Sequence, residues 1–247
     1  LQAAKGAKLI FNISASPYSM GKTEEREDII RQQCMENNIT VCYTNLVGGQ
    51  DEIVFDGGSF VMDNTGNTFY KAPSFREGLF VIDIPIEKAE KTQKAAFYIS
   101  HSISENKPFI TIPEYKEITK EEEVYLALMI GLRDYVLKNG FKKVVLGLSG
   151  GIDSSLVATI ASDALGSENV VGVFMPSRYS SKESEEDAKL LAENLKIAFI
   201  TIPIDDIFTT YLETLSPIFS GKKLDITEEN LQARIRGNIL MALSNKF

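Results

Sequence analysis

Apolar runs and helical periods alternate along the second half of the chain. Residues 144–148, 170–175 and 198–204 are short and almost wholly apolar, which is typical of strands buried on both faces of a parallel sheet. Segments with apolar residues at helical intervals separate and flank these runs, and they cover 119–139, 153–165, 180–195 and 227–247. This alternation predicts an α/β fold built on a doubly wound parallel sheet.

Helix-starting residues mark three of these helical segments. Thr119, Ser180 and Thr227 each precede an acidic first turn, so each is predicted to be the N-cap. The polar segment between the last strand and the last helix contains a proline, and we predict a connection without regular structure there.

The first half has shorter apolar runs and more turn residues. Strands are predicted over 7–13, 40–46, 53–55, 59–62, 68–70 and 79–84. The fourth and fifth of these flank the turn residues 63–67 and predict a hairpin. Thr23 is predicted to cap a helix that ends near Asn38, and Gly48–Gly49 is predicted to turn the chain.

The periodic pattern decays between the two halves. Residues 87–118 mix charges with prolines and have no sustained period, so they predict a linker. The predicted domains are therefore 1–86 and 119–247. The chain starts within a strand-like segment and stops within a helical one, so we expect it to be a fragment at both ends.

Composition excludes several classes of protein. A net charge of −8 argues against a large nucleic-acid footprint, because such surfaces carry surplus Lys and Arg. No apolar run approaches the roughly 20 residues of a membrane span. With only Cys34 and Cys42, a disulfide framework is not expected, which indicates a reducing, cytoplasmic setting. Cys42 lies inside an apolar strand pattern, where a small buried thiol is favoured over a nucleophile.

The sequence SGGIDSS, residues 149–155, follows the first buried strand of the second half and opens a helix. A glycine turn between strand and helix directs free backbone N–H groups and the helix dipole at one point, where phosphate binds. The Walker lysine is missing, so other groups must offset the ligand's charge. A carboxylate at Asp153 would repel phosphate unless it held a bridging Mg²⁺. The alternative is an ordinary tight turn in which Asp153 caps the helix.

Two further groups of polar residues are predicted to face ligands. Ser149 and Ser177 follow neighbouring strands of the parallel sheet, which places Arg178 at the same edge, where its guanidinium could neutralise phosphate. The alternative is a solvated loop arginine. On the last helix, Asn230, Arg234 and Gly237 are spaced to share one face, either lining a polar pocket or forming a surface stripe.

The loop SGGIDSS resembles that of the ATP pyrophosphatases, which split ATP into AMP and pyrophosphate. Together with MPSRYSS and ENLQARIRGNILMALSNKF, it resembles the synthetase domain of the glutamine-dependent NAD synthetase family. The stretches NISASPYSMGKTEERE and NLVGGQDEIVFDGGSFV are similar to the C-terminal part of that family's nitrilase-type glutaminase domain. The resemblance implies part of a nitrilase-type α-β-β-α sandwich, followed by an incomplete adenine nucleotide α-hydrolase-like domain.

The same resemblance implies ligands for particular residues. ATP, a co-substrate, would be held by Gly147, Leu148, Ser149, Gly150, Gly151, Ile152, Asp153, Ser154 and Arg178. Asp153 would ligate Mg²⁺, Asn230 and Arg234 would contact deamido-NAD, and Ser16 and Lys22 would hold glutamine. Taken without the family, Lys22 is a solvated lysine before a helix and Ser16 is part of a turn before proline.

The family's reaction amidates deamido-NAD to NAD with ATP and with ammonia from glutamine, releasing AMP, pyrophosphate and glutamate. The resemblance places the glutaminase Glu, Lys and nucleophilic Cys upstream of Leu1, so this chain alone is expected to hydrolyse no glutamine. It also implies a homo-oligomer acting on small molecules, with no nucleic-acid or membrane partner.

Two alternative functions remain open. One is another enzyme with this loop, such as a GMP synthetase-like amidotransferase or a tRNA-thiolating enzyme. The other is a nucleotide-binding module without catalysis.

Overall fold

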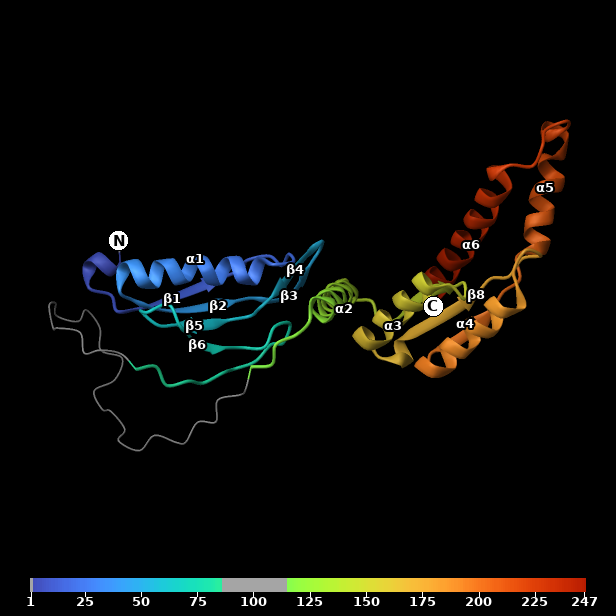
Figure 1. The fold of residues 1–247 in the computed structure, drawn as a ribbon. Helices are drawn as coiled ribbons and strands as arrows, with labels where there is room; N and C mark the ends of the chain where they lie inside the picture. Colours follow the sequence, from blue (N-terminus) through green and yellow to red (C-terminus); the bar gives the residue numbers. More distant parts are fainter. Residues whose placement is uncertain (1, 86–114) are drawn as a thin grey trace. The chain divides into compact units, whose positions relative to one another are not determined.

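The computed structural model describes residues 2–85 and 115–247 (Figure 1). The chain divides into two compact units, Leu1–Gly131 and Leu132–Phe247. The predicted linker 87–118 lies mostly outside the described residues, and the domain boundaries stay a prediction.

The first unit contains a four-stranded sheet in the order β1-β2-β5-β6. Its strands are β1 (Leu9–Ser14), β2 (Thr40–Asn45), β5 (Phe60–Met62) and β6 (Thr68–Lys71), after a short 3₁₀ helix, η1 (Ala3–Lys5). β1 and β2 are parallel because helix α1 (Lys22–Asn37) connects them, whereas β5 and β6 form the predicted antiparallel hairpin. In its turn, the Asp63 carboxylate accepts the backbone N–H groups of Thr65 and Asn67.

Alternate side chains of β2 point to opposite faces of this sheet. Val41 and Tyr43 pack with Cys34 of α1, which lies along one face (Figure 1). Cys42 points to the other face and packs with Phe80 and other apolar residues of the segment after β6. The prediction of a strand at 79–84 is wrong, since this segment buries alternate side chains without forming a strand.

A second hairpin, β3 (Val47–Gln50) and β4 (Ile53–Asp56), follows β2. The predicted turn at Gly48–Gly49 is wrong, because both glycines pair within β3 and the chain turns at Asp51–Glu52. Val47 and Val54 of this hairpin pack with Phe75, Ala127 and Ile130. The last two belong to α2 (Lys120–Lys138), whose start follows Thr119 as predicted: the Glu122 N–H donates to Thr119 Oγ1 at 3.2 Å.

The second unit is built on a parallel sheet, as the alternating pattern predicted. Its strands are β7 (Val144–Leu148), β8 (Val170–Phe174) and β9 (Ala198–Thr201), in that order. Its helices are α3 (Ile152–Leu165), α4 (Lys182–Leu195), α5 (Asp205–Phe219) and α6 (Ile226–Lys246), with a 3₁₀ turn, η2 (Ser167–Asn169), before β8. α3 and α4 cover one face of the sheet, and α5 and α6 cover the other.

The prediction of a connection without regular structure between β9 and α6 is wrong, because helix α5 lies there. Ile204, Phe208 and Leu212 recur at intervals of four and pack against Val173 and Ile235. Pro217 lies in the last turn of the helix, where its missing N–H removes one backbone hydrogen bond without breaking the helix in its middle.

Three predicted N-caps are also wrong by one or two residues. α1 starts after Gly21, so Thr23 lies inside the helix. Ser181 caps α4 in place of Ser180, and its side chain accepts the Ser184 N–H. Asp225 caps α6 in place of Thr227 and forms a capping box with Glu228. In α4 and α6 a neighbouring side chain reaches the free amides of the first turn, whereas α1 starts after a glycine without a side-chain cap.

Phe208 is expected to contribute more to stability than any exposed aromatic residue of the same helix. Its side chain is 1% exposed, whereas Tyr211 is 41% exposed. Phe208→Ala should lower the free energy of unfolding by about 3–5 kcal/mol, and Tyr211→Ala by about 1 kcal/mol or less. Urea denaturation followed by circular dichroism measures both, and equal losses would contradict the placement of α5.

Candidate functional sites

The glycine loop connects β7 to α3 at the carboxyl edge of the parallel sheet. Leu148, the last residue of β7, pairs with Phe174, the last residue of β8, so the loops after both strands lie at the same edge. The loop turns at Gly150, whose φ of +77° lies in the left-handed region that favours glycine. The strand, glycine turn and helix start predicted for this segment are all present.

Hydroxyl groups close the loop. Ser154 Oγ donates to the Gly151 carbonyl at 2.9 Å, and it accepts the Ser149 N–H at 3.2 Å. Ser149 Oγ in turn accepts the Gly151 N–H at 3.2 Å. Gly151 is the N-cap of α3 and no side chain caps the helix there, so Asp153 is not the cap. The Asp153 carboxylate is exposed in the first turn of α3.

Gly150 packs directly against the first turn of α4. A Cβ atom at this position would lie 2.5 Å from the Ser184 carbonyl oxygen and 2.7 Å from the Ser184 Cα. Such distances are not possible, so any larger residue requires the loop to move. Close packing therefore holds the loop beside the N-terminus of α4, where Ser181 Oγ accepts the Ser184 N–H at 3.1 Å.

Arg178 lies in the loop after β8, at the same edge of the sheet as the glycine loop, as the sequence predicted. Its Nε donates to Asp205 Oδ1 at 3.2 Å, and one of its terminal nitrogens donates to Thr209 Oγ1 at 2.7 Å. The backbone N–H of Arg178 also binds Asp205, and this bond, followed by the guanidinium, lowers the pKa of Asp205. The side chain is half exposed and engaged with α5, so it is not simply a solvated loop arginine.

Asn230 and Arg234 are both exposed and lie one turn apart on α6. Leu231 and Ile235, next to them, point to the sheet. Arg236 points elsewhere, and its Nε donates to the Met175 carbonyl at 3.1 Å. Burial lowers the pKa of Arg236. Helix α6 thus carries a half-buried arginine that contacts the segment after β8 and, separately, an exposed polar pair.

In the first unit, Ser16 lies in the loop between β1 and α1, and Lys22 is the first residue of α1; each has its own partner. Ser16 Oγ accepts a hydrogen bond from Arg26 Nε at 3.2 Å. Lys22 Nζ lies 2.7 Å from Glu25 Oε2 in an ion pair on the helix surface.

Around Ser16 lies a buried network that the sequence reasoning missed. Arg26 binds Asp56 through two parallel hydrogen bonds of 2.8 and 2.9 Å, and their side chains are 6% and 1% exposed. Burial alone would lower the pKa of Arg26, but the bonds to Asp56 outweigh it and raise that pKa. One signal was available: Arg26 stands between two pairs of acidic residues in TEERED, residues 23–28.

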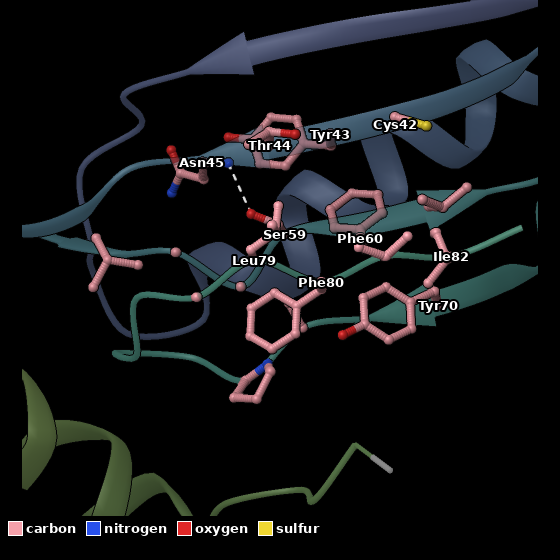
Figure 2. A pocket seen from close by; sticks show the side chains of 18 of the residues that line it. Cys42, Tyr43, Thr44, Asn45, Ser59, Phe60, Tyr70, Leu79, Phe80 and Ile82 are labelled. Atoms are coloured by element: carbon pink, nitrogen blue, oxygen red, sulfur yellow. Dashed lines mark hydrogen bonds between the residues drawn. The ribbon is translucent and has the colours of Figure 1, made fainter. Parts of the chain in front are cut away.

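A cavity of about 500 Å³ lies on the face of the sheet away from α1. Figure 2 shows Phe60, Tyr70, Phe80 and Ile82 around it, with Asn45 and Ser59 at one end. Cys42 also lines it and is 6% exposed, while Cys34 is fully buried, and burial raises the pKa of both thiols. The prediction of a small buried thiol at Cys42 is confirmed, Cys34 is buried as well, and neither thiol has the lowered pKa of an activated nucleophile.

Comparison with known proteins identifies relatives of both units. Residues 124–247 match the family model described as NAD synthase, and residues 2–94 match the one described as carbon-nitrogen hydrolase. The chain is 48% identical to the glutamine-dependent NAD(+) synthetase of Thermotoga maritima and 45% identical to that of Aquifex aeolicus. These alignments cover 100% and 99% of this chain but only 45% and 46% of the relatives, so the chain spans about half their length.

A solved structure agrees with these matches. The glutamine-dependent NAD+ synthetase of Acinetobacter baumannii, in complex with adenosine diphosphate, superposes with a TM-score of 0.84 at 36% identity. The superposition covers 100% of this chain and 43% of the Acinetobacter baumannii chain. Among the described residues, no helix is long and apolar enough to cross a membrane.

Gly150→Ala tests whether contact with Ser184 shapes the loop. Gly140 is the matched control: its φ is +80°, yet a Cβ there would meet nothing within 4 Å. Both variants should lose about 1 kcal/mol from the left-handed backbone alone, and Gly150→Ala should lose at least about 1 kcal/mol more from the clash. Chemical denaturation measures the difference, and equal losses would contradict the packing described here.

Proposed function

The chain belongs to the NAD synthase family, and from that membership we propose that the protein containing it amidates deamido-NAD to NAD. The observation that carries the proposal is the glycine loop, whose closed turn leads directly into the uncapped N-terminus of α3. An uncapped helix N-terminus next to a glycine turn is suited to phosphate. The ADP complex of the Acinetobacter baumannii relative supports an adenine nucleotide as the ligand.

The reaction proceeds in two substitutions. A carboxylate oxygen of deamido-NAD attacks the α-phosphorus of ATP, the bond to the β-phosphate oxygen breaks, and pyrophosphate leaves. Ammonia then attacks the activated carbonyl carbon, loses a proton, and expels AMP. Activation is needed because a carboxylate is a poor acyl donor until one of its oxygens leaves as phosphate.

The residues of the loop fit a Mg²⁺ ion that would be held mainly by phosphate oxygens of the nucleotide and by one carboxylate of the protein. No group of three or more His, Cys, Asp or Glu side chains in the described residues could hold a metal by itself. Mg²⁺ commonly uses one or two carboxylates together with phosphate oxygens and water, and the exposed Asp153 supplies one carboxylate. When bound, the ion would offset phosphate charge that the loop, without a lysine, does not neutralise.

The remaining site residues take their roles from the same proposal. Gly147–Ser154 hold the ATP phosphates, with Arg178 close to them at the sheet edge, and Asn230 and Arg234 contact deamido-NAD. Arg178 must release Asp205 or bind phosphate with the nitrogens that Asp205 and Thr209 leave available.

In the first unit, Ser16 and Lys22 hold glutamine, which supplies the ammonia; the relatives' description as glutamine-dependent NAD(+) synthetases supports this role. We further propose a cytoplasmic homo-oligomer, supported by the two free cysteines and by the family resemblance.

Asp153→Asn tests the proposal in the full-length protein. It should lower the rate of Mg²⁺-dependent pyrophosphate release by roughly a hundredfold, because loss of one supporting group commonly costs a metal site that much. Deamido-NAD, ATP and ammonia are supplied, and AMP, pyrophosphate and NAD are measured.

Asp187→Asn is the control, since Asp187 is exposed on α4 beyond its first turn. It should leave all three products unchanged. Full activity of Asp153→Asn would contradict the proposal that Asp153 binds Mg²⁺. Nucleotide binding without any product from the unmodified protein would favour a non-catalytic module.

A further inference from the structure

Three buried polar side chains converge on Ser16 from three different elements. Arg26 comes from α1, Asn45 from the end of β2 and Asp56 from the end of β4, and they are 6%, 7% and 1% exposed. They are the buried polar and charged residues found in the described part of the first unit. Polar groups are costly to bury unless they are hydrogen-bonded, so their gathering around one loop residue calls for a physical reason.

Asn45 fixes the backbone of Ser16. Its Oδ1 accepts the Ser16 N–H at 2.9 Å, and its Nδ2 donates to the Ser16 carbonyl at 3.2 Å. The Asn45 backbone N–H is itself bonded to Ser59 Oγ at 3.0 Å, as Figure 2 shows. One side-chain amide thus occupies both backbone groups of Ser16, as a neighbouring strand would, and holds the residue in a loop that has no strand beside it.

Arg26 fixes the side chain of Ser16 and the residue after it. Its Nε donates to Ser16 Oγ at 3.2 Å, and one terminal nitrogen donates to the Pro17 carbonyl at 3.3 Å. A guanidinium has donors and no acceptor. The proton of the Ser16 hydroxyl therefore cannot point to Arg26, and the hydroxyl keeps its own donor for another oxygen.

Asp56 holds the guanidinium in the plane that this geometry requires. Its two oxygens accept from both terminal nitrogens of Arg26, and paired bonds of this kind restrict rotation of the guanidinium. Oδ2 also accepts from Thr23 Oγ1 at 3.3 Å. Asp56 does not itself bond to Ser16, so any effect it has on a ligand passes through Arg26.

We propose that Arg26 and Asp56 are positioning residues for glutamine: they orient the Ser16 hydroxyl so that it donates to an oxygen of that substrate. The inference rests on the proposed role of Ser16. It adds that the ligand atom at Ser16 is a hydrogen-bond acceptor, such as a carboxylate oxygen, and that the buried ion pair controls how well it is held.

A double-mutant cycle in the full-length protein tests this. Ser16→Ala removes the hydroxyl, and Arg26→Lys keeps the charge beside Asp56 but removes the fixed Nε–H. Ser16→Ala should lower kcat/KM for glutamine about tenfold, and Arg26→Lys about fivefold, each corresponding to the loss of one hydrogen bond. Because Arg26 acts through Ser16, the double variant should stay near tenfold instead of reaching about fiftyfold.

Arg31→Lys is the matched control. Arg31 lies on the same helix, where it pairs with Asp28 and donates to the Gly66 carbonyl, away from Ser16. It should leave kcat/KM for glutamine unchanged. Effects of Ser16→Ala and Arg26→Lys that multiply would overturn the proposal, because a purely structural role of Arg26 would not depend on the Ser16 hydroxyl. No effect of Arg26→Lys alone would overturn it too.

Each variant is also assayed with ammonia in place of glutamine, and that rate is the reference for the same preparation. If the unmodified protein made no NAD from either glutamine or ammonia, the proposed function would be overturned. If the two substitutions had multiplicative effects on kcat/KM for glutamine while the rate with ammonia was unchanged, only the positioning role would be overturned. If Arg26→Lys does not fold, Thr23→Val replaces it in the cycle. Thr23→Val removes one hydrogen bond to Asp56 and leaves the ion pair intact. We expect it to lower kcat/KM for glutamine about twofold by itself and to have no further effect in combination with Ser16→Ala.

Discussion

The close approach of Gly150 to Ser184 is the contact on which the second unit's site depends. A residue with a side chain would overlap the backbone of α4, and the φ of +77° would add strain of its own. With glycine there, the turn between β7 and α3 fits against the first turn of α4. The hydroxyls of Ser149 and Ser154 then close the loop from inside. The loop is consequently rigid before any ligand arrives, which lowers the entropy lost on binding.

Strand register explains why the other candidate residues lie near this loop. β7 and β8 are parallel and in register from Val144–Val170 to Leu148–Phe174, so the segments that follow them start at the same edge. Arg178 and Met175 arrive there with β8, and Arg236 joins them from α6 by binding the Met175 carbonyl. Apolar packing on both faces of the sheet maintains that register, because a slip of one residue would exchange the sets that face α3–α4 and α5–α6.

Local sequence patterns predicted the elements that depend on local chemistry. β7 has the predicted bounds, α2 starts directly after Thr119 as expected, and α3 starts one residue before the predicted Asp153. α5 was missed because Pro217 and the polar residues around it hid the spacing of Ile204, Phe208 and Leu212. The segment 79–84 alternates as a strand does, but alternation records only which side chains are buried and not whether the backbone finds a partner.

The two sites differed in how much the sequence could predict, and the difference is physical. The glycine loop is a backbone site within seven consecutive residues, so its geometry follows from the residue types that each backbone conformation allows. The Ser16 site is a side-chain site. Arg26 and Asp56 are 30 positions apart, and Asn45 lies 29 positions from Ser16, so only the fold brings them together. The sequence shows only a basic residue among acids, and every one of those neighbouring carboxylates is a possible partner for it. The fold selects Asp56, because a carboxylate that is 1% exposed is costly to bury without a paired cation.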